Sequence, residues 1–231
     1  MNRMSIAAAA LAIASWSLPG SGFAAEKAVK LPPPAQDAPA TAATETAVFA
    51  GGCFWGVQAV FQHTRGVLNA VSGYAGGDQR TARYDAVGTG RTGHAESVQV
   101  TYDPKQVSFG TLLQVYFSVA HDPTTLNRQG PDVGPQYRSA VFYRNADQKR
   151  VTETYIAQLD AARVYPAKIV TEVRPLTGFF AAEAYHQDYA TLHPGSPYIA
   201  TYDLPKIANL KSVLPHLYRE QPVLVSTQPK A

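Results

Sequence analysis

The stretch Gly51-Gly52-Cys53-Phe54-Trp55-Gly56 determines the local fold around the residue that carries the chemistry. It follows a short apolar run at 47–50, which we expect to be a strand. It leads into 53–63, where apolar side chains recur at helical spacing. Glycines permit positive φ, so the backbone can turn sharply between strand and helix. The sequence therefore places a cysteine at the first turn of a helix, where the helix dipole favours an anion.

Cys53 is the single cysteine among 231 residues. This excludes an intrachain disulfide and a metal site built from several cysteines. A thiol at a helix N-terminus can have its pKa lowered from ~8.5 to about 3.5–7.5, which makes it a nucleophile near neutral pH. The alternative is a buried, inert thiol. The flanking glycines and adjacent aromatic residues favour the reactive thiol, and Phe54 and Trp55 either pack in the core or hold a small apolar group against the sulfur.

The other predicted elements alternate between strands and helices. Ser108 and Asn145 are good N-cap residues for two of the helices. This order predicts an α+β fold with helices on one face of a mixed sheet. The expected strands are 47–50, 66–73, 94–102, 138–144 and 167–173, and the expected helices are 53–63, 108–120, 145–163 and 179–192.

Glu96 is the second candidate for chemistry. Side chains alternate along a strand, so Glu96 in strand 94–102 shares a face with the apolar Val98 and Val100. A carboxyl group on an apolar face has a raised pKa and can stay protonated, which a general acid requires. The alternative is a solvated or salt-bridged glutamate at the strand end. His94-x-Glu96 also resembles zinc deaminases, but the Pro-Cys-x-x-Cys of those enzymes is absent.

Three further candidates lie in loops, which commonly carry functional residues over the ends of a sheet. Asp132 and Tyr137 belong to the polar loop 121–136 and its continuation, and Tyr84 precedes the strand of Glu96. Each can supply hydrogen bonds to a ligand. Turn formation for Asp132 and ordinary packing for the two tyrosines are the alternatives.

The two ends of the chain differ in composition from the centre. We expect a secretory signal peptide at 1–24, cut near Ala24 or Ala25, and an Ala/Pro-rich tether at 25–46. One folded domain follows at 47–220, with a tail at 221–231. The leader is shorter than the ~20 apolar residues of a spanning helix. We expect export to the periplasm and no membrane span. A dispersed net charge of +3 gives no indication of nucleic-acid binding.

Several separate motifs, in order, resemble peptide methionine sulfoxide reductase A over roughly 49–218. They are Gly-Cys-Phe-Trp-Gly at 52–56, Tyr-Ala-Gly-Gly at 74–77, Gly-His-Ala-Glu at 93–96, the Asn-Arg-Gln-Gly…Gln-Tyr-Arg-Ser loop at 127–139, and Ala-Glu-x-Tyr-His-Gln at 182–187. The resemblance implies a two-layer α+β sandwich with a ferredoxin-like core. It implies reduction of the S epimer of methionine sulfoxide, free or in proteins.

The resemblance also implies a role for each candidate residue. Cys53 matches the nucleophile, Glu96 the acid, Tyr84 and Tyr137 the tyrosines that bond the sulfoxide oxygen, Phe54 and Trp55 the methyl pocket, and Asp132 an aspartate that positions substrate and water. Thiolate attack on the sulfoxide sulfur then leaves a sulfenic acid on the cysteine.

Recycling of the enzyme departs from the family pattern. Many members carry one or two further cysteines near the C-terminus, whereas this chain has Pro197-Tyr198-Ile199-Ala200 there. We therefore expect no bound cofactor or metal and an external thiol reductant, either a thioredoxin-like protein, glutaredoxin or glutathione.

Two other classes of protein are alternatives. A cysteine hydrolase or acyltransferase would use His94 or His186 as the base for Cys53. A non-catalytic module would only capture oxidised methionine. By its spacing, the pair Glu183 and His186 stabilises a helix or anchors a loop.

Overall fold

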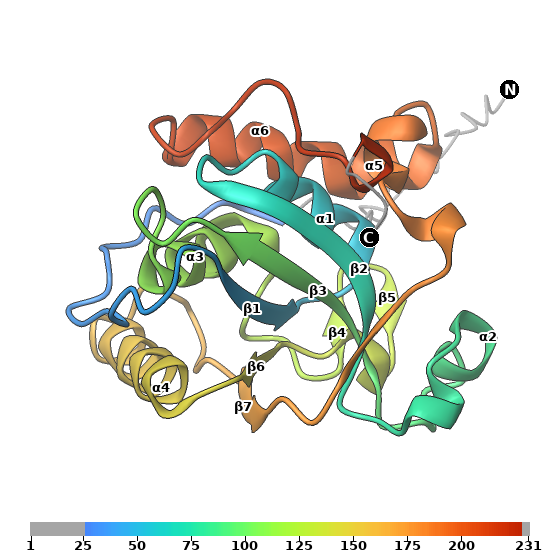
Figure 1. The fold of residues 1–231 in the computed structure, drawn as a ribbon, viewed down its shortest axis with the longest axis horizontal. Coiled ribbons are helices and arrows are strands. Elements are labelled where there is room, and N and C mark those ends of the chain that lie inside the picture. Colours follow the sequence, from blue (N-terminus) through green and yellow to red (C-terminus); the bar gives the residue numbers. More distant parts are fainter. Residues whose placement is uncertain (1–25, 228–231) are drawn as a thin grey trace, which may run out of the picture.

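A six-stranded sheet forms the centre of the molecule (Figure 1). The structure, a computed structural model, describes residues 26–227. The strands lie in the order β7-β6-β1-β3-β2-β8. Their bounds are β1 Glu45–Ala50, β2 Val67–Ala75, β3 Ala95–Tyr102, β6 Ala140–Tyr143, β7 Glu172–Pro175 and β8 Phe179–Ala181. A separate hairpin pairs β4 (Arg128–Gln129) with β5 (Asp132–Val133).

Four of these strands have ferredoxin-like topology. In the order β6-β1-β3-β2, each neighbouring pair is antiparallel. Helix α1 (Phe54–Gln62) connects β1 to β2, and α3 (Phe109–Val115) follows β3 on the way to β6. β8 adds an antiparallel edge and β7 a parallel one, which makes the sheet mixed. The predicted α+β fold with a ferredoxin-like core is confirmed.

Helices cover one face of this sheet and form the second layer. On β1, Phe49 stacks on Phe61 of α1 and on Tyr116 directly after α3, with ring centroids 5.0 and 5.1 Å apart. Helix α4 (Ala146–Ala161) joins the same core through Tyr155. Helix α6 (Leu204–Val213) packs on α1. Burying these aromatic rings stabilises the fold and fixes α1, whose first turn carries Cys53.

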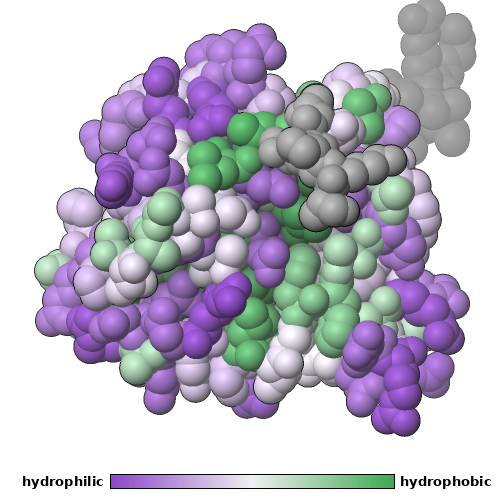
Figure 2. Space-filling model, in the orientation of Figure 1, coloured by the Kyte–Doolittle hydropathy of each residue, from purple (hydrophilic) through white to green (hydrophobic). Residues whose placement is uncertain are grey.

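The opposite face of the sheet carries a smaller core that is rich in alanine. Ala50, Ala75, Ala95 and Ala140 are fully buried there, and the partly buried Phe179 packs against them. In the view of Figure 2, apolar residues gather over the middle of the molecule and hydrophilic residues surround them. Val48 and Phe142 complete this smaller core, and most of the buried aromatic rings lie on the helical side.

Two predicted elements are wrong in place or type. The strand expected at 167–173 forms only at β7, because the N–H groups of Ile169 and Val170 bond to Asp160 and Pro123 in other segments. The helix expected at 179–192 is strand β8, a 3₁₀ turn at Ala184–His186 and the short α5 (Tyr189–Leu192). Asp188 interrupts it with a left-handed φ of 58°.

The segment expected to be a tether has no helix or strand before β1, but it packs on the domain. Leu31 is only 4% exposed, and its carbonyl accepts a hydrogen bond from Gln114 at 2.8 Å. The carbonyl of Pro32 accepts one from the Tyr155 hydroxyl at 2.7 Å. The segment is therefore anchored along the helical layer. The expected signal peptide at 1–24 lies outside the described residues.

The beginning of the expected tail is also attached. Val223 donates its N–H to the carbonyl of Gln62 at 3.1 Å, and Val225 donates its N–H to Asp188 at 2.9 Å. Across residues 26–227, no helix has the length and apolar character needed to cross a bilayer.

Candidate active site

Cys53 is the N-cap residue of α1, as the sequence predicted. Gly52 before it has a φ of +89°, and a Cβ there would lie 2.6 Å from the Cβ of Gln129. A side chain at position 52 would therefore meet both backbone strain and a clash with β4. The glycine allows the chain to turn under the hairpin and present the thiol at the helix start.

The ionisation of Cys53 differs from the prediction. Burial raises the pKa of its thiol well above the ordinary value, and the carboxyl groups of Glu96, Asp203 and Asp132 raise it further. The N–H of Trp55 at the helix start opposes this rise. The predicted lowering of the pKa is therefore wrong, because removing the thiolate from water outweighs the helix dipole. The neutral thiol is the favoured form near neutral pH.

Glu96 lies on β3 and is 3% exposed. Its Oε2 accepts a hydrogen bond of 3.0 Å from the N–H of Phe54, the first residue of α1. Burial raises the Glu96 pKa to about 8, the bond from Phe54 opposes the rise, and the charges of Asp132 and Asp203 add to it. The bond thus holds Glu96 at Phe54, the residue that follows Cys53. The carboxyl group of Glu96 is protonated at neutral pH, as expected for a general acid.

Tyr84 and Tyr137 reach the same site from different elements. Tyr84 begins the short helix α2 (Tyr84–Val87), and Tyr137 ends a 3₁₀ turn at Pro135–Tyr137. Burial raises the pKa of both phenols, and the charges of Glu96, Asp132 and Cys53 raise each further. Both hydroxyl groups therefore remain hydrogen-bond donors at neutral pH.

An aromatic wall stands beside the thiol. Phe54 is buried, Trp55 is half-buried, and His186 packs against both with ring centroids 5.1 and 5.8 Å away. Tyr84 lies 4.3 Å from the His186 ring, and Tyr189 stacks on Trp55 at 3.9 Å. These rings form the apolar surface that the sequence predicted from Phe54 and Trp55 alone.

His186 and Glu183 form two anchors of this wall. Nδ1 of His186 accepts a hydrogen bond from the Trp55 indole at 3.2 Å. Glu183 accepts from the Tyr74 hydroxyl at 2.8 Å and from the Tyr84 N–H at 3.0 Å. The anchoring role expected for this pair is confirmed, although no long helix carries it.

Asp132 begins β5 and is half-buried. It accepts a hydrogen bond from the hydroxyl of Tyr198, and burial raises its pKa. Asp132, Tyr198 and Cys53 line one small pocket together with Lys206 and Glu26. The structure therefore brings all seven predicted residues to one place around α1.

The sequence analysis missed three charged residues near the thiol. Lys206 is 4% exposed and Asp203 is fully buried, although both residue types are usually on the surface. Glu26 pairs with Lys206 at 3.3 Å. The Asp203-Leu204-Pro205 sequence offered one signal, because a proline in the first turn marks the start of a helix. Among residues 26–227, no cluster of three or more His, Cys, Asp or Glu is arranged to hold a metal ion.

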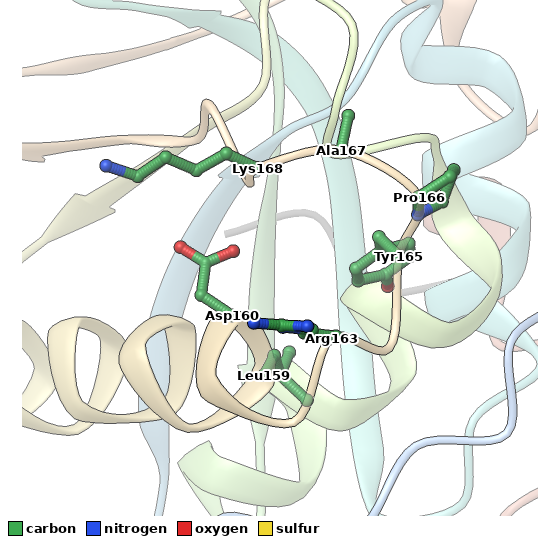
Figure 3. A pocket seen from close by; sticks show the side chains of 7 residues that line it. All are labelled: Leu159, Asp160, Arg163, Tyr165, Pro166, Ala167 and Lys168. Atoms are coloured by element: carbon green, nitrogen blue, oxygen red, sulfur yellow. The ribbon is translucent and has the colours of Figure 1, made fainter.

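A second, more open pocket lies away from Cys53, at the end of α4 (Figure 3). Asp160, Arg163 and Lys168 contribute its charged side chains. The carboxylate of Asp160 accepts the N–H of Ile169 at 3.1 Å and so closes the loop after α4. This pocket shares no residue with the thiol site.

Comparison with known proteins agrees with this geometry. The family described as "Peptide methionine sulfoxide reductase" matches residues 45–216. The chain belongs to this family. It is an oxidoreductase that reduces methionine sulfoxide.

Individual relatives are similar over most of their length. The chain is 61% identical over 189 residues to "Peptide methionine sulfoxide reductase MsrA 2" of Mesorhizobium japonicum, covering 82% of this chain and 97% of that protein. It is 47% identical over 175 residues to the Thermus thermophilus MsrA, covering 76% and 98%. Methionine sulfoxide reductase A of Corynebacterium diphtheriae has a similar structure, with a TM-score of 0.57 and 34% identity over 77% of this chain and 91% of that one.

A cysteine hydrolase would need a histidine base beside Cys53, and neither candidate histidine is placed as one. His94 accepts the N–H of Gly77 at 3.2 Å and faces the carbonyl of Asp78 at 3.0 Å, so its ring is fully occupied in a loop. His186 holds Trp55. Neither imidazole is hydrogen-bonded to Cys53, as an activating base requires.

Proposed function

We propose that this reductase acts on the S epimer of methionine sulfoxide, free or in proteins, with Cys53 as nucleophile and Glu96 as acid. The observation that supports this most directly is the bond from the Phe54 N–H to Glu96. It holds a protonated carboxyl group beside the thiol. The same helix turn thus orients the attacking group and the proton donor.

The proposed reaction moves one oxygen atom. Cys53 attacks the sulfoxide sulfur while Glu96 protonates the oxygen, and Tyr84 and Tyr137 donate hydrogen bonds to the charge that develops there. In net terms, a thiol and a sulfoxide become a sulfenic acid and a thioether. Because the free thiol is neutral, proton loss from Cys53 is coupled to protonation of the substrate oxygen.

Epimer selection follows from two fixed subsites. The methyl group of the substrate lies against Phe54 and Trp55, and the oxygen lies between the tyrosines and Glu96. Asp132, held by Tyr198, orients the substrate from the hairpin side. The opposite epimer cannot fill the methyl and oxygen subsites together.

Recycling requires a reductant from outside the chain. Cys53 is the single cysteine of these 231 residues, so a sulfenic acid on it has no partner thiol among them. We propose that a thioredoxin-like protein, glutaredoxin or glutathione reduces it. We also propose that the protein is exported to the periplasm, where it repairs oxidised proteins.

A single-turnover assay with each epimer tests the assignment. One equivalent of the S epimer, without thiol, should release one methionine per enzyme and leave a dimedone-reactive sulfenic acid on Cys53. The R epimer should release none. Cys53→Ser should abolish the release with dithiothreitol present. Release of methionine without a Cys53 adduct would contradict sulfenic acid recycling, and activity of Cys53→Ser would contradict the nucleophile.

A further inference from the structure

A buried charged cluster lies beside Cys53, on the side of α6. It consists of Glu26, Asp203 and Lys206, and we call it the α6 cluster. The ammonium group of Lys206 is 3.3 Å from Glu26 Oε2 and 3.9 Å from Asp203 Oδ1. The three residues come from the N-terminal segment and the start of α6, so they meet only in the folded protein.

The α6 cluster is incompletely paired. Asp203 is fully buried, and neither of its carboxyl oxygens has a hydrogen-bond partner within the described chain. Burying such a group costs free energy, and apolar residues of similar volume are often more stable in its place. Asp203 also packs on the first turn of α1, because a Cβ at Gly56 would lie 2.1 Å from its Oδ1. A buried carboxyl group that lacks hydrogen-bond partners and lies this close to a reactive turn points to a chemical role.

The α6 cluster acts on Cys53 directly through its charges. Lys206 and Glu26 line the same small pocket as the thiol. A negative Cys53 raises the pKa of Lys206, which means that the two charges attract one another. A negative Asp203 raises the pKa of Cys53. Burial raises the pKa of Asp203 itself to about 7, so it can exchange a proton near neutral pH.

Two acidic groups therefore lie near the start of α1 on two sides. Glu96 bonds to the N–H of Phe54 from the sheet, and Asp203 packs against Gly56 from the start of α6, next to Lys206 in the pocket of Cys53. The proposed oxygen transfer uses only Glu96. The α6 cluster has no role in the proposed reduction of the sulfoxide, which is the first half-reaction.

We propose that Asp203 and Lys206 serve the recycling of oxidised Cys53 by an external thiol. This rests on the proposed function. In the first step the thiolate attacks the Cys53 sulfur, an S–S bond forms, and the S–O bond breaks. Asp203 donates the proton that converts the leaving hydroxide to water. In the second step another thiolate attacks the reductant's sulfur, and Cys53 leaves as a thiolate beside Lys206, with a disulfide of the reductant as product.

The charges of the α6 cluster suit this sequence. Once Asp203 has given up its proton, its anion lies 3.9 Å from the Lys206 ammonium. The same ammonium then stabilises the departing thiolate, which lowers the effective pKa of the leaving group and speeds exchange. Glu26 moderates the positive charge in the resting protein.

The test separates the two half-reactions in one protein. Cys53 is first oxidised with one equivalent of the S epimer, and the methionine release is timed. The sulfenic acid is then mixed with glutathione or with a thioredoxin, and the loss of dimedone reactivity and the release of Cys53 thiol are followed. Lys206 shares a pocket with Cys53, and Asp203 raises the pKa of both Cys53 and Glu96, so their variants can affect both half-reactions. Lys206→Met and Asp203→Asn should slow recycling at least about tenfold more than they slow methionine release.

Matched variants control for folding and charge. Lys211→Met removes an exposed lysine of the same helix and should change neither half-reaction. Lys206→Arg should retain most of the recycling rate. Glu26→Gln should act in the opposite direction to Lys206→Met and increase the alkylation rate of Cys53 by iodoacetamide at pH 7.

The outcomes are distinct. Equal losses in both half-reactions, or unchanged recycling, would overturn the recycling site. A loss with thioredoxin alone would also overturn it, because it would indicate a docking contact instead of chemistry on Cys53. If the wild-type protein forms no sulfenic acid, the proposed function fails before the recycling site is tested. If Lys206→Met does not fold, Glu26→Gln decides, because unchanged alkylation would contradict the role of Lys206.

Discussion

The indole N–H of Trp55 donates a hydrogen bond to Nδ1 of His186 at 3.2 Å, joining helix α1 to a 3₁₀ turn 131 residues away in the sequence. The bond fixes the tautomer of His186, because Nδ1 accepts and Nε2 must carry the proton. Burial lowers the pKa of His186, which keeps the ring neutral and preserves this acceptor near neutral pH. The proposed methyl subsite thus depends on a histidine that has no part in the proposed reaction.

Replacing His186 with leucine should loosen the methyl subsite. The indole N–H would lose its partner in a partly buried place, at a cost of about 1–3 kcal/mol of stability. We expect KM for methionine sulfoxide to rise severalfold, while alkylation of Cys53 stays nearly unchanged. His186→Asn offers an acceptor at a similar position and should recover most of the KM. Equal KM values for both variants would show that the hydrogen bond does not position Trp55.

Replacing Glu96 with glutamine should slow sulfoxide reduction without disturbing the fold. The amide can replace the carboxyl group in shape and still accept from Phe54, but it cannot give up a proton. We expect the single-turnover rate to fall by about 10²–10⁴. Rapid-quench measurement of methionine release checks this. A rate within a factor of about two would remove Glu96 from the acid role.

Glu96 also predicts a pH dependence of stability. Its pKa is about 8 in the folded protein and near the ordinary value of 4.5 when unfolded, so the folded state binds the proton more tightly. Its contribution is fully present below about pH 4.5 and is lost as the pH rises through about 8. Glu96→Gln removes this titration. Denaturant unfolding from pH 5 to 9 should show wild type losing on the order of a few kcal/mol relative to the variant. Parallel curves would contradict the raised pKa.

Replacing Gly56 with alanine should lower the free energy of unfolding, which is the opposite of the usual effect in a helix. Alanine normally stabilises a helix by about 1 kcal/mol. Here its Cβ would lie 2.1 Å from Asp203 Oδ1, so Gly56→Ala should destabilise the protein by about 1–3 kcal/mol. Adding Asp203→Ala should recover much of the loss. Gly195→Ala, where the Cβ meets no atom within 4 Å, is the control. The unfolding free energies of the wild type, the two single variants and the double variant form a double-mutant cycle. Simple additivity of the two effects would contradict the contact.

Local sequence signals predicted the elements that local physics controls. The alternation along β3 placed Glu96 on the buried face. Ser108 was predicted to cap a helix, and its hydroxyl accepts the N–H of Thr111 at 3.1 Å. The glycines before Cys53 correctly placed the strand-to-helix turn. Each of these features depends on neighbours within a few residues.

Features that depend on contacts between distant segments could not be predicted from the sequence. Gln187 lies in the predicted helix 179–192, yet its amide bonds to the N–H and carbonyl of Ser72 on β2, which holds the segment in an extended course. The pKa of Cys53 depends on burial by segments far along the chain, so the helix dipole alone gave the wrong direction. Lys206 is buried where Glu26, from the far N-terminal segment, pairs with it.

The N-terminal segment gives the last prediction. Leu31 is buried in the main core and is the apolar anchor of residues 26–44. Leu31→Asp should place a charge in that site, cost about 2–4 kcal/mol, and release the segment to rapid proteolysis. Lys30→Asp, at the exposed neighbouring position, should remain protected. Because Glu26 lies at the start of this segment and pairs with Lys206, release should also speed alkylation of Cys53. Cleavage at equal rates in wild type and Leu31→Asp would show that the segment is not held by this contact.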